Sequence, residues 1–325
     1  MKKYIILLAM ACMLVFSMTA CGANKDKKDD GKFQIVTTIF PEYDWVRELT
    51  KGNDNVEITL LLDNGVDLHS YQPTADDIIK VSDCDMFIYV GGESDEWVED
   101  ALANKTNKDM VVINLLDVLG ENVKEEELVE GMEGEEEEEE GEEEEGPEYD
   151  EHVWLSVKSS SIICSKIAEE LEKADPDNKS IYEANAKEYI AKLDELDNKY
   201  QEVVSGAKYD TVLFGDRFPF RYLVDDYNLD YFAAFVGCSA ESEASFETIT
   251  FLADKVDELG LKSILQIETS DGKIANTIKD NTKSKDQQIL TMDSMQSVTA
   301  DELQSGVTYI SVMESNLEVL KSALN

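Results

Sequence analysis

Residues 33–62 read FQIVTTIFPEYDWVRELTKGNDNVEITLLL. Residues 33–39 and 56–62 are apolar runs rich in β-branched side chains, which favour strands. Between them we expect a helix over 41–50, with Pro41 in its first turn and Gly52 just after its end. Apolar strands that alternate with helices are typical of a parallel sheet covered on both faces. This stretch therefore predicts an α/β fold.

The same alternation continues outward to the C-terminus. The pattern predicts strands at 86–90, 110–115, 211–214, 230–235, 263–267 and 288–292, and helices at 73–81, 96–103, 157–173, 245–259, 271–281 and 308–324. Residues 178–205 form one helical pattern without Gly or Pro, which would extend about 40 Å. Without its N-terminal signal, the chain has roughly 300 residues, which exceeds what a single core usually organises. We therefore expect two domains.

The N-terminus has the features of an export signal. A short basic start precedes an apolar run at 5–16, which is too short for a membrane span, and small residues then precede Cys21. We expect a lipoprotein signal peptide at 1–20, lipidation of Cys21, and a flexible tether at 21–32. The alternative is an ordinary signal peptide with an incidental cysteine. No later stretch of 18 apolar residues occurs, so the rest of the chain is expected to be soluble.

The pattern of cysteines predicts neither disulfide bonds nor a cysteine metal site. With Cys12 removed and Cys21 lipidated, Cys84, Cys164 and Cys238 remain. Their number is odd and no CxxC pair occurs, so the pattern favours neither disulfides nor a thiolate zinc site. Cys84 and Cys164 accompany helical patterns, where we expect them to be buried as small apolar residues.

The charge of the chain is strongly negative. Lys and Arg number 29 against 71 Asp and Glu, giving a net charge of −42 at pH 7. Nucleic-acid binding needs clustered basic residues, so cations are the more plausible partners. Residues 121–149, the acidic segment, consist mainly of Glu and Gly, and we expect them to form a disordered insertion. This segment either binds hard cations weakly or is a solvated loop without function.

The chain has only two histidines, His69 and His152, and both lie in short polar loops near carboxylates. Neutral imidazole suits divalent metals of intermediate softness, so the two together form a candidate metal site. The alternative is that each is a structural histidine with its hydrogen bonds satisfied. His69 follows the second predicted strand, at the edge of a parallel sheet where ligands bind.

The segments around both histidines resemble the solute-binding proteins of zinc and manganese ABC transporters. Residues 65–77 match the form G-x-x-x-H-x-Y-x-P-x-x-x-D around His69, and residues 150–156 match D-x-H-x-W-L-S around His152. The similarity continues to the C-terminus and covers nearly all of the mature chain. The resemblance implies that both histidines are metal ligands.

The resemblance also implies the architecture. It predicts two lobes with parallel sheets flanked by helices, an N-terminal lobe at 33–175 and a C-terminal lobe at 206–325, joined by a linking helix at 176–205. The metal would lie between the lobes.

Two further ligands are implied with less direct matches. The family has a His or Glu after the first strand of the second lobe, where this chain has Gly215-Asp216-Arg217, and ungapped alignment places Arg217 at that position. Because a guanidinium has no lone pair to donate, the prediction is Asp216. Arg217 or Arg221 could instead be its ion-pair partner. The family's fourth ligand, an acid after the last strand, is matched by Asp293.

One more acidic residue is expected near the site. Glu268 resembles a family position outside the ligand set, and Arg217 could likewise support the ligands from behind. No catalytic residues and no resident cofactor are predicted.

The function implied is a lipid-anchored, extracytoplasmic binding protein, expected to be a monomer, that delivers a divalent metal to an ABC permease and its ATPase. Zn²⁺ is favoured over Mn²⁺ because long charged insertions resemble those of zinc-type members, although this insertion contains no histidine. The alternatives are a metal-dependent hydrolase, which no HExxH or G-x-S-x-G motif supports, and an acidic adhesin or interaction protein.

Overall fold

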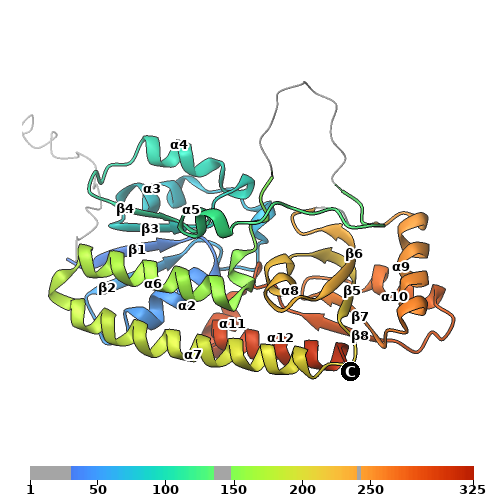
Figure 1. Cartoon of the computed structure of the whole chain (residues 1–325). Coiled ribbons are helices and arrows are strands. Elements are labelled where there is room, and N and C mark those ends of the chain that lie inside the picture. Colours follow the sequence, from blue (N-terminus) through green and yellow to red (C-terminus); the bar gives the residue numbers. More distant parts are fainter. Residues whose placement is uncertain (1–30, 135–147, 240–242) are drawn as a thin grey trace, which may run out of the picture. The chain divides into compact units, whose positions relative to one another are not determined.

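The computed structural model describes residues 31–134, 148–239 and 243–325. Its first half is built on a parallel sheet with strand order β2-β1-β3-β4. The strands are β1 (Phe33–Thr37), β2 (Val56–Leu60), β3 (Met86–Tyr89) and β4 (Val111–Asn114). The helices between and after them are α2 (Phe40–Leu49), α3 (Ala75–Asp83), α4 (Trp97–Ala103) and α5 (Leu115–Leu119) (Figure 1).

The second half carries another parallel sheet, with strand order β6-β5-β7-β8. Its strands are β5 (Thr211–Phe218), β6 (Asp230–Val236), β7 (Ser263–Ile267) and β8 (Gln288–Met292). The helices of this half are α8 (Arg221–Tyr227), α9 (Phe246–Leu259), α10 (Lys273–Asn281), α11 (Ala300–Ser305) and α12 (Tyr309–Ala323). The predicted α/β class with two parallel sheets is confirmed.

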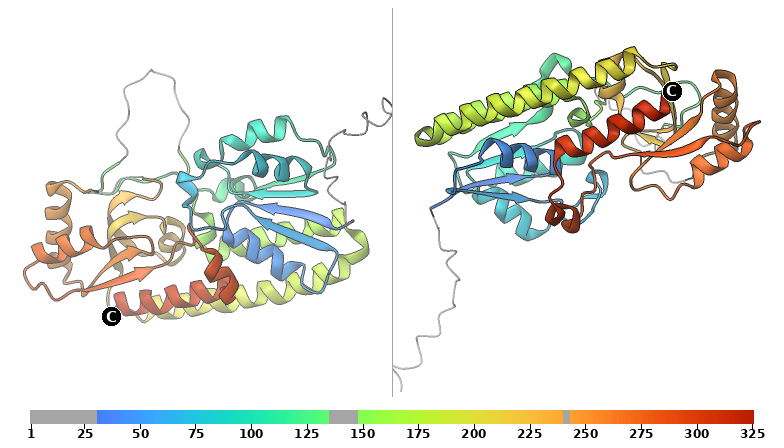
Figure 2. Two further views of the ribbon diagram at one scale, coloured as in Figure 1. Left: turned by 180° about the vertical axis from the view of Figure 1, so that it is seen from behind. Right: turned by 90° about the horizontal axis from the view of Figure 1, so that it is seen from below.

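Two helices connect the halves. Ser156 accepts a hydrogen bond from Ser159 N and so begins α6 (Val157–Ala174), which packs against α7 (Lys179–Ser205). The buried stripe of α7 has the helical spacing that the sequence predicts, and it contains Tyr182, Ala186, Tyr189, Leu193, Leu196 and Tyr200. Because α7 contacts both α2 and α12, it runs along both halves (Figure 2). The predicted long helix between the lobes is confirmed.

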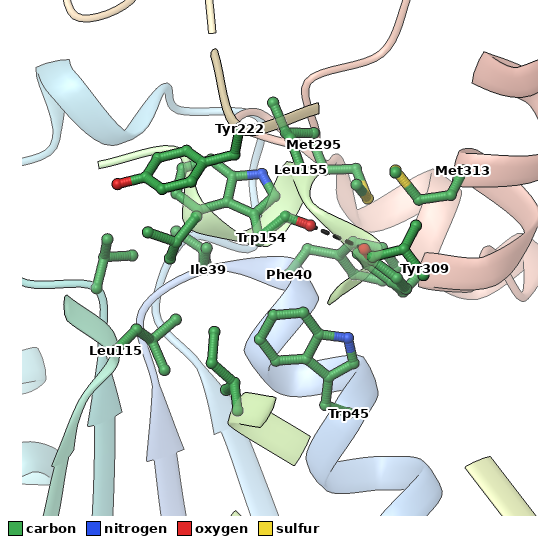
Figure 3. Close-up of a cluster of buried hydrophobic side chains, with 14 of the residues drawn as sticks. Ile39, Phe40, Trp45, Leu115, Trp154, Leu155, Tyr222, Met295, Tyr309 and Met313 are labelled. Atoms are coloured by element: carbon green, nitrogen blue, oxygen red, sulfur yellow. Dashed lines mark hydrogen bonds between the residues drawn. The ribbon is translucent and has the colours of Figure 1, made fainter. Parts of the chain in front are cut away.

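The larger hydrophobic core contains side chains from both halves. At its centre, Trp45 and Tyr309 meet edge to face, with ring centroids 5.3 Å apart, and Trp154 lies beside them (Figure 3). The Tyr309 hydroxyl donates to Trp154 O at 2.8 Å, and Trp154 Nε1 donates to Ser294 O at 2.8 Å. Segments far apart in the sequence are thereby fixed around Trp154.

Part of the acidic segment is ordered, contrary to the prediction of a disordered insertion. Glu126 N donates to Glu148 O at 2.9 Å, and Glu133 N donates to Ala234 O at 2.9 Å. Val123, Val129 and Met132 pack against the core. The described ends of the segment therefore bury apolar side chains, which are hard to recognise in a sequence that consists mainly of glutamate. The glutamate run at 135–147 lies outside the described residues.

Other predictions also lie outside the described residues: the signal peptide, the lipidation of Cys21 and nearly all of the tether. The proposed lobe boundaries stay predictions. In residues 31–134, 148–239 and 243–325, no helix combines the length and the apolar composition of a membrane span.

Candidate metal site

His69 is held in place by the turn that carries it. The turn Leu68–Ser70 follows β2, and the Asp67 carboxylate accepts the His69 backbone N–H at 3.1 Å. The other oxygen of Asp67 forms an ion pair with Arg217 of β5, so a residue of the second half fixes the histidine loop of the first. His69 Nδ1 lies 2.8 Å from Ser94 Oγ.

His152 is fully buried and lies just before the turn Val153–Leu155. Asp150 Oδ1 accepts from the backbone N–H of His152 at 2.8 Å and from its ring Nδ1 at 3.0 Å. Trp154, two residues on, is anchored to Ser294. The turn therefore fixes both the ring and its orientation.

The two rings face each other across a short gap. His69 Nε2 lies 3.2 Å from His152 Nε2. The Gln296 amide nitrogen lies 2.9 Å from the first and 2.5 Å from the second. An amide NH₂ has two hydrogens, so it donates one to each Nε2, while the two Nδ1–H groups donate to Ser94 and Asp150. Both rings thus direct an Nε2 lone pair at one point.

This arrangement matches a zinc site. Two imidazoles bound to one tetrahedral zinc at 2.0–2.1 Å have nitrogens about 3.3 Å apart. The observed Nε2 separation is 3.2 Å. The Asp150–His152 pair is also the carboxylate–histidine arrangement that orients metal-binding imidazoles. The neutral Gln296 NH₂ group occupies the point between the two Nε2 atoms, where a metal would receive both lone pairs.

Electrostatics keep the His69 imidazole available. Burial, then the neighbouring His152, then the positive charge of Arg217, hold the pKa of His69 well below its usual range. The ring is therefore neutral, as a metal ligand must be. Nearby, Glu151 accepts from Ser94 N at 2.9 Å, and burial raises the pKa of this carboxyl.

Cys238 completes the cluster, which the sequence did not predict. The ligand atoms of His69, His152 and Cys238 all lie within 4.8 Å of one another, and no other such group of His, Cys, Asp or Glu occurs in the described parts of the chain. Cys238 follows β6, and a Cβ on Gly237 would lie 2.9 Å from His152 Cε1. The loop can therefore approach His152 only because residue 237 is glycine. The one available sequence signal was the position of Cys238, just after a strand at the ligand-binding edge.

Asp216 is not brought into the histidine cluster. β5 does not end at Phe214 but continues to Phe218, with an irregularity between Phe214 and Arg217, so Asp216 lies within the strand and not beyond it. One Asp216 oxygen accepts from Arg217 N at 2.9 Å, and the other lies 3.3 Å from Ile267 N. Arg217 pairs with Asp67 instead of with Asp216.

Asp293 also lies outside this three-residue group. Its Oδ1 accepts from Met295 N at 2.8 Å, in the loop that carries Gln296. Burial raises the pKa of the Asp293 carboxyl. Asp293 therefore shapes the Gln296 loop in this structure.

Glu268 and Arg217 are each linked to the histidine cluster through other residues, Glu268 through Ser294 and Gln296 and Arg217 through Asp67. Glu268 accepts from Ser294 N at 2.8 Å and from its hydroxyl at 2.7 Å, and Ser294 Oγ is also 3.0 Å from Gln296 Oε1. Burial, then the charge of Asp293, raise the pKa of Glu268 to about 7.

Residues 35–323 match the family model described as "Zinc-uptake complex component A periplasmic". The zinc-binding lipoprotein AdcA of Streptococcus pneumoniae is 34% identical over 327 residues, which cover 99% of this chain but 61% of AdcA. The high-affinity zinc uptake system protein ZnuA of Bacillus subtilis is 32% identical over 320 residues, covering 97% of this chain and 95% of that protein.

Solved structures agree with these matches. The zinc-bound ZnuA-like domain of S. pneumoniae AdcA superposes with a TM-score of 0.70 at 29% identity, covering 90% of this chain and 99% of that domain. The metal-dependent lipoprotein YcdH of B. subtilis gives a TM-score of 0.72 at 28% identity, with 90% and 99% covered. The chain spans about three fifths of the length of the AdcA protein that it matches, 61%.

Proposed function

Because the chain belongs to the zinc-uptake complex component A family, we propose that it captures a divalent transition metal between His69 and His152 for import into the cell. The family membership predicted from the two histidine motifs is confirmed. The family consists of metal-binding transport proteins, so the prediction that the chain is not an enzyme is also confirmed.

The observation that carries the proposal is the meeting of the two Nε2 lone pairs at one buried point. Their 3.2 Å separation suits a single bound ion, and the Asp150 carboxylate holds one ring in the tautomer that a metal needs. Zn²⁺ is the proposed cargo in preference to Mn²⁺, because paired imidazoles suit zinc and manganese prefers oxygen ligands.

Asp216 and Asp293 stay proposed ligands. To bind the ion, each carboxylate has to break the hydrogen bonds that it makes in this structure. Replacing each by Asn tests this, because a neutral amide is a poorer ligand than a carboxylate. A large loss of zinc affinity in Asp216→Asn or Asp293→Asn would place that residue in the ligand set.

The remaining parts of the proposal concern the cell. The protein would act extracytoplasmically as a monomer, held to the membrane by a lipid on Cys21, and would pass its metal to an ABC permease driven by its ATPase. Incorporation of labelled fatty acid, lost in Cys21→Ala, tests the anchor. Metal uptake that needs both this protein and the permease tests delivery.

Calorimetric zinc titration tests the site itself. We expect one tight ion per chain, and its loss in both His69→Ala and His152→Ala. Ser70→Ala is the matched control, because Ser70 is the exposed neighbour of His69 in the same turn. Zinc-dependent thermal stabilisation should disappear in the same two variants and persist in the control. Unchanged zinc affinity in either histidine variant would contradict the proposal.

A further inference from the structure

We propose that Cys238 binds the metal as a thiolate, supplying the third ligand beside His69 and His152. This inference rests on the proposed function, because it concerns the same ion. It changes the chemistry of the site from nitrogen and oxygen to nitrogen and sulfur. A thiolate ligand makes the site selective for thiophilic ions.

The position of the Cys238 sulfur supports this assignment. Around a tetrahedral zinc with N and S ligands, the sulfur and each nitrogen lie about 3.6 Å apart. The three ligand atoms already lie within 4.8 Å of one another, so each sulfur–nitrogen separation needs to shorten by at most about 1.2 Å to reach that geometry. A cysteine side chain achieves such a movement by rotating about a single bond.

The surrounding loop is built to bring Cys238 close to the histidines. Gly237 lacks the Cβ that would contact His152 Cε1 at 2.9 Å and Phe218 O at 2.9 Å. The Cys238 N–H donates to Glu126 Oε1, with nitrogen and oxygen 3.5 Å apart, and Glu126 belongs to the described part of the acidic segment. The loop therefore contacts both the ring of His152 and the carboxylate of Glu126.

The other candidates for the third position are occupied. Arg217 pairs with Asp67 and has no lone pair to give. The Asp216 carboxylate is directed at the backbone of Arg217 and Ile267. Among the His, Cys, Asp and Glu side chains of the described structure, Cys238 is the one that groups with both histidines.

Binding of the metal by the Cys238 thiol needs no reactant besides the ion itself. When the ion binds, the Cys238 S–H bond breaks, the metal–sulfur bond forms, and the proton passes to the solvent. A bound dication deprotonates a coordinating thiol, although burial raises the pKa of the Cys238 thiol in the unbound cluster. One thiolate and two neutral imidazoles leave a single positive charge on a zinc site, which lowers the cost of burying the ion.

Cobalt absorption spectroscopy under reducing conditions tests the assignment. Co²⁺ bound to thiolate gives an intense near-ultraviolet charge-transfer band that nitrogen and oxygen ligands do not give. We expect this band in the wild-type protein at one Co²⁺ per chain, and its loss in Cys238→Ser. Cys84→Ser is the control, because Cys84 is a buried thiol that donates to Val81 O, and its replacement should leave the band in place.

Metal affinities provide a second readout that a structural role would not reproduce. Cys238→Ser should lose more than tenfold in Cd²⁺ affinity and less than about threefold in Mn²⁺ affinity, because the soft ligand matters only to the thiophilic ion. Equal losses for both ions would mean that the substitution had only disturbed the fold, and would overturn the assignment.

The outcomes separate the two proposals. Wild-type protein that binds Co²⁺ at His69 and His152 without the thiolate band overturns the role of Cys238 and leaves the proposed function standing. This result needs no variant, so it stays informative if Cys238→Ser fails to fold. Wild-type protein that takes up neither Zn²⁺ nor Co²⁺ overturns the proposed function, and the role of Cys238 with it.

Discussion

The orientation of His152 should depend on one buried carboxylate. Asp150 is 2% exposed, and its Oδ1 accepts both the backbone N–H and the ring Nδ1–H of His152. Asp150→Asn keeps the shape of the side chain but removes its charge. If the NH₂ group of the new amide faced His152 Nδ1, it would donate to that nitrogen, and the imidazole proton would move to Nε2. Loss of such a partner typically weakens metal binding by about 10–100-fold, or about 1.4–2.7 kcal/mol.

The assay is zinc competition against a chromophoric chelator, with the histidine tautomer read by nitrogen NMR. We expect weaker zinc binding in Asp150→Asn, together with a shift of the His152 signal away from the Nδ1–H form. Asp226→Asn is the control, because this carboxylate accepts from the hydroxyl of Ser156, four residues after His152, and not from a histidine. Equal affinity in Asp150→Asn and wild type, or equal losses in both variants, would refute the argument.

Three further predictions follow from the contacts around the site. Gly237→Ala should destabilise the fold by about 1–3 kcal/mol and weaken zinc binding, because the added Cβ overlaps the buried His152 ring. Denaturant unfolding measures the stability and zinc titration the affinity. Wild-type values of both would contradict the close approach of Gly237 to His152. Arg217→Ala should lower the stability by about 1.5–3 kcal/mol, because Asp67 loses its ion-pair partner, and it should weaken zinc binding severalfold. A stronger zinc affinity in this variant would show that the Arg217 cation only repels the metal. Excising residues 134–146 should leave equilibrium zinc affinity unchanged and slow association in stopped flow at low salt, the difference fading at high salt; loss of the tight site would show that the acidic run contributes ligands.

Most of the fold could be predicted because each element has a local signal. The boundaries predicted for residues 263–267 and 288–292 coincide with β7 and β8, since both are apolar runs flanked by polar residues. Three short helices, α5, α8 and α11, were not predicted, because five to seven residues span less than two helical turns and show the helical period poorly. β5 was predicted too short, since Gly215 and Asp216 look like the end of a strand but lie inside an irregular one.

The site was predictable only where motifs carry it. His69 and His152 lie in two specific patterns, and the structure brings them together across 83 positions of sequence. Cys238 and Gln296 have no local pattern, and only the folding of separate loops places them against the histidines. The ion pair between Arg217 and Asp67 is equally non-local, which is why the structure was needed to find the partner of Arg217.

An anomalous-difference map at the zinc absorption edge, from crystals of the zinc-loaded protein, tests the central claim most directly. The account predicts one strong peak bonded to His69 Nε2 and His152 Nε2, with the Gln296 amide nitrogen displaced from the point it now occupies between them. A zinc peak bound elsewhere, with the two imidazoles still hydrogen-bonded to Gln296, would contradict it.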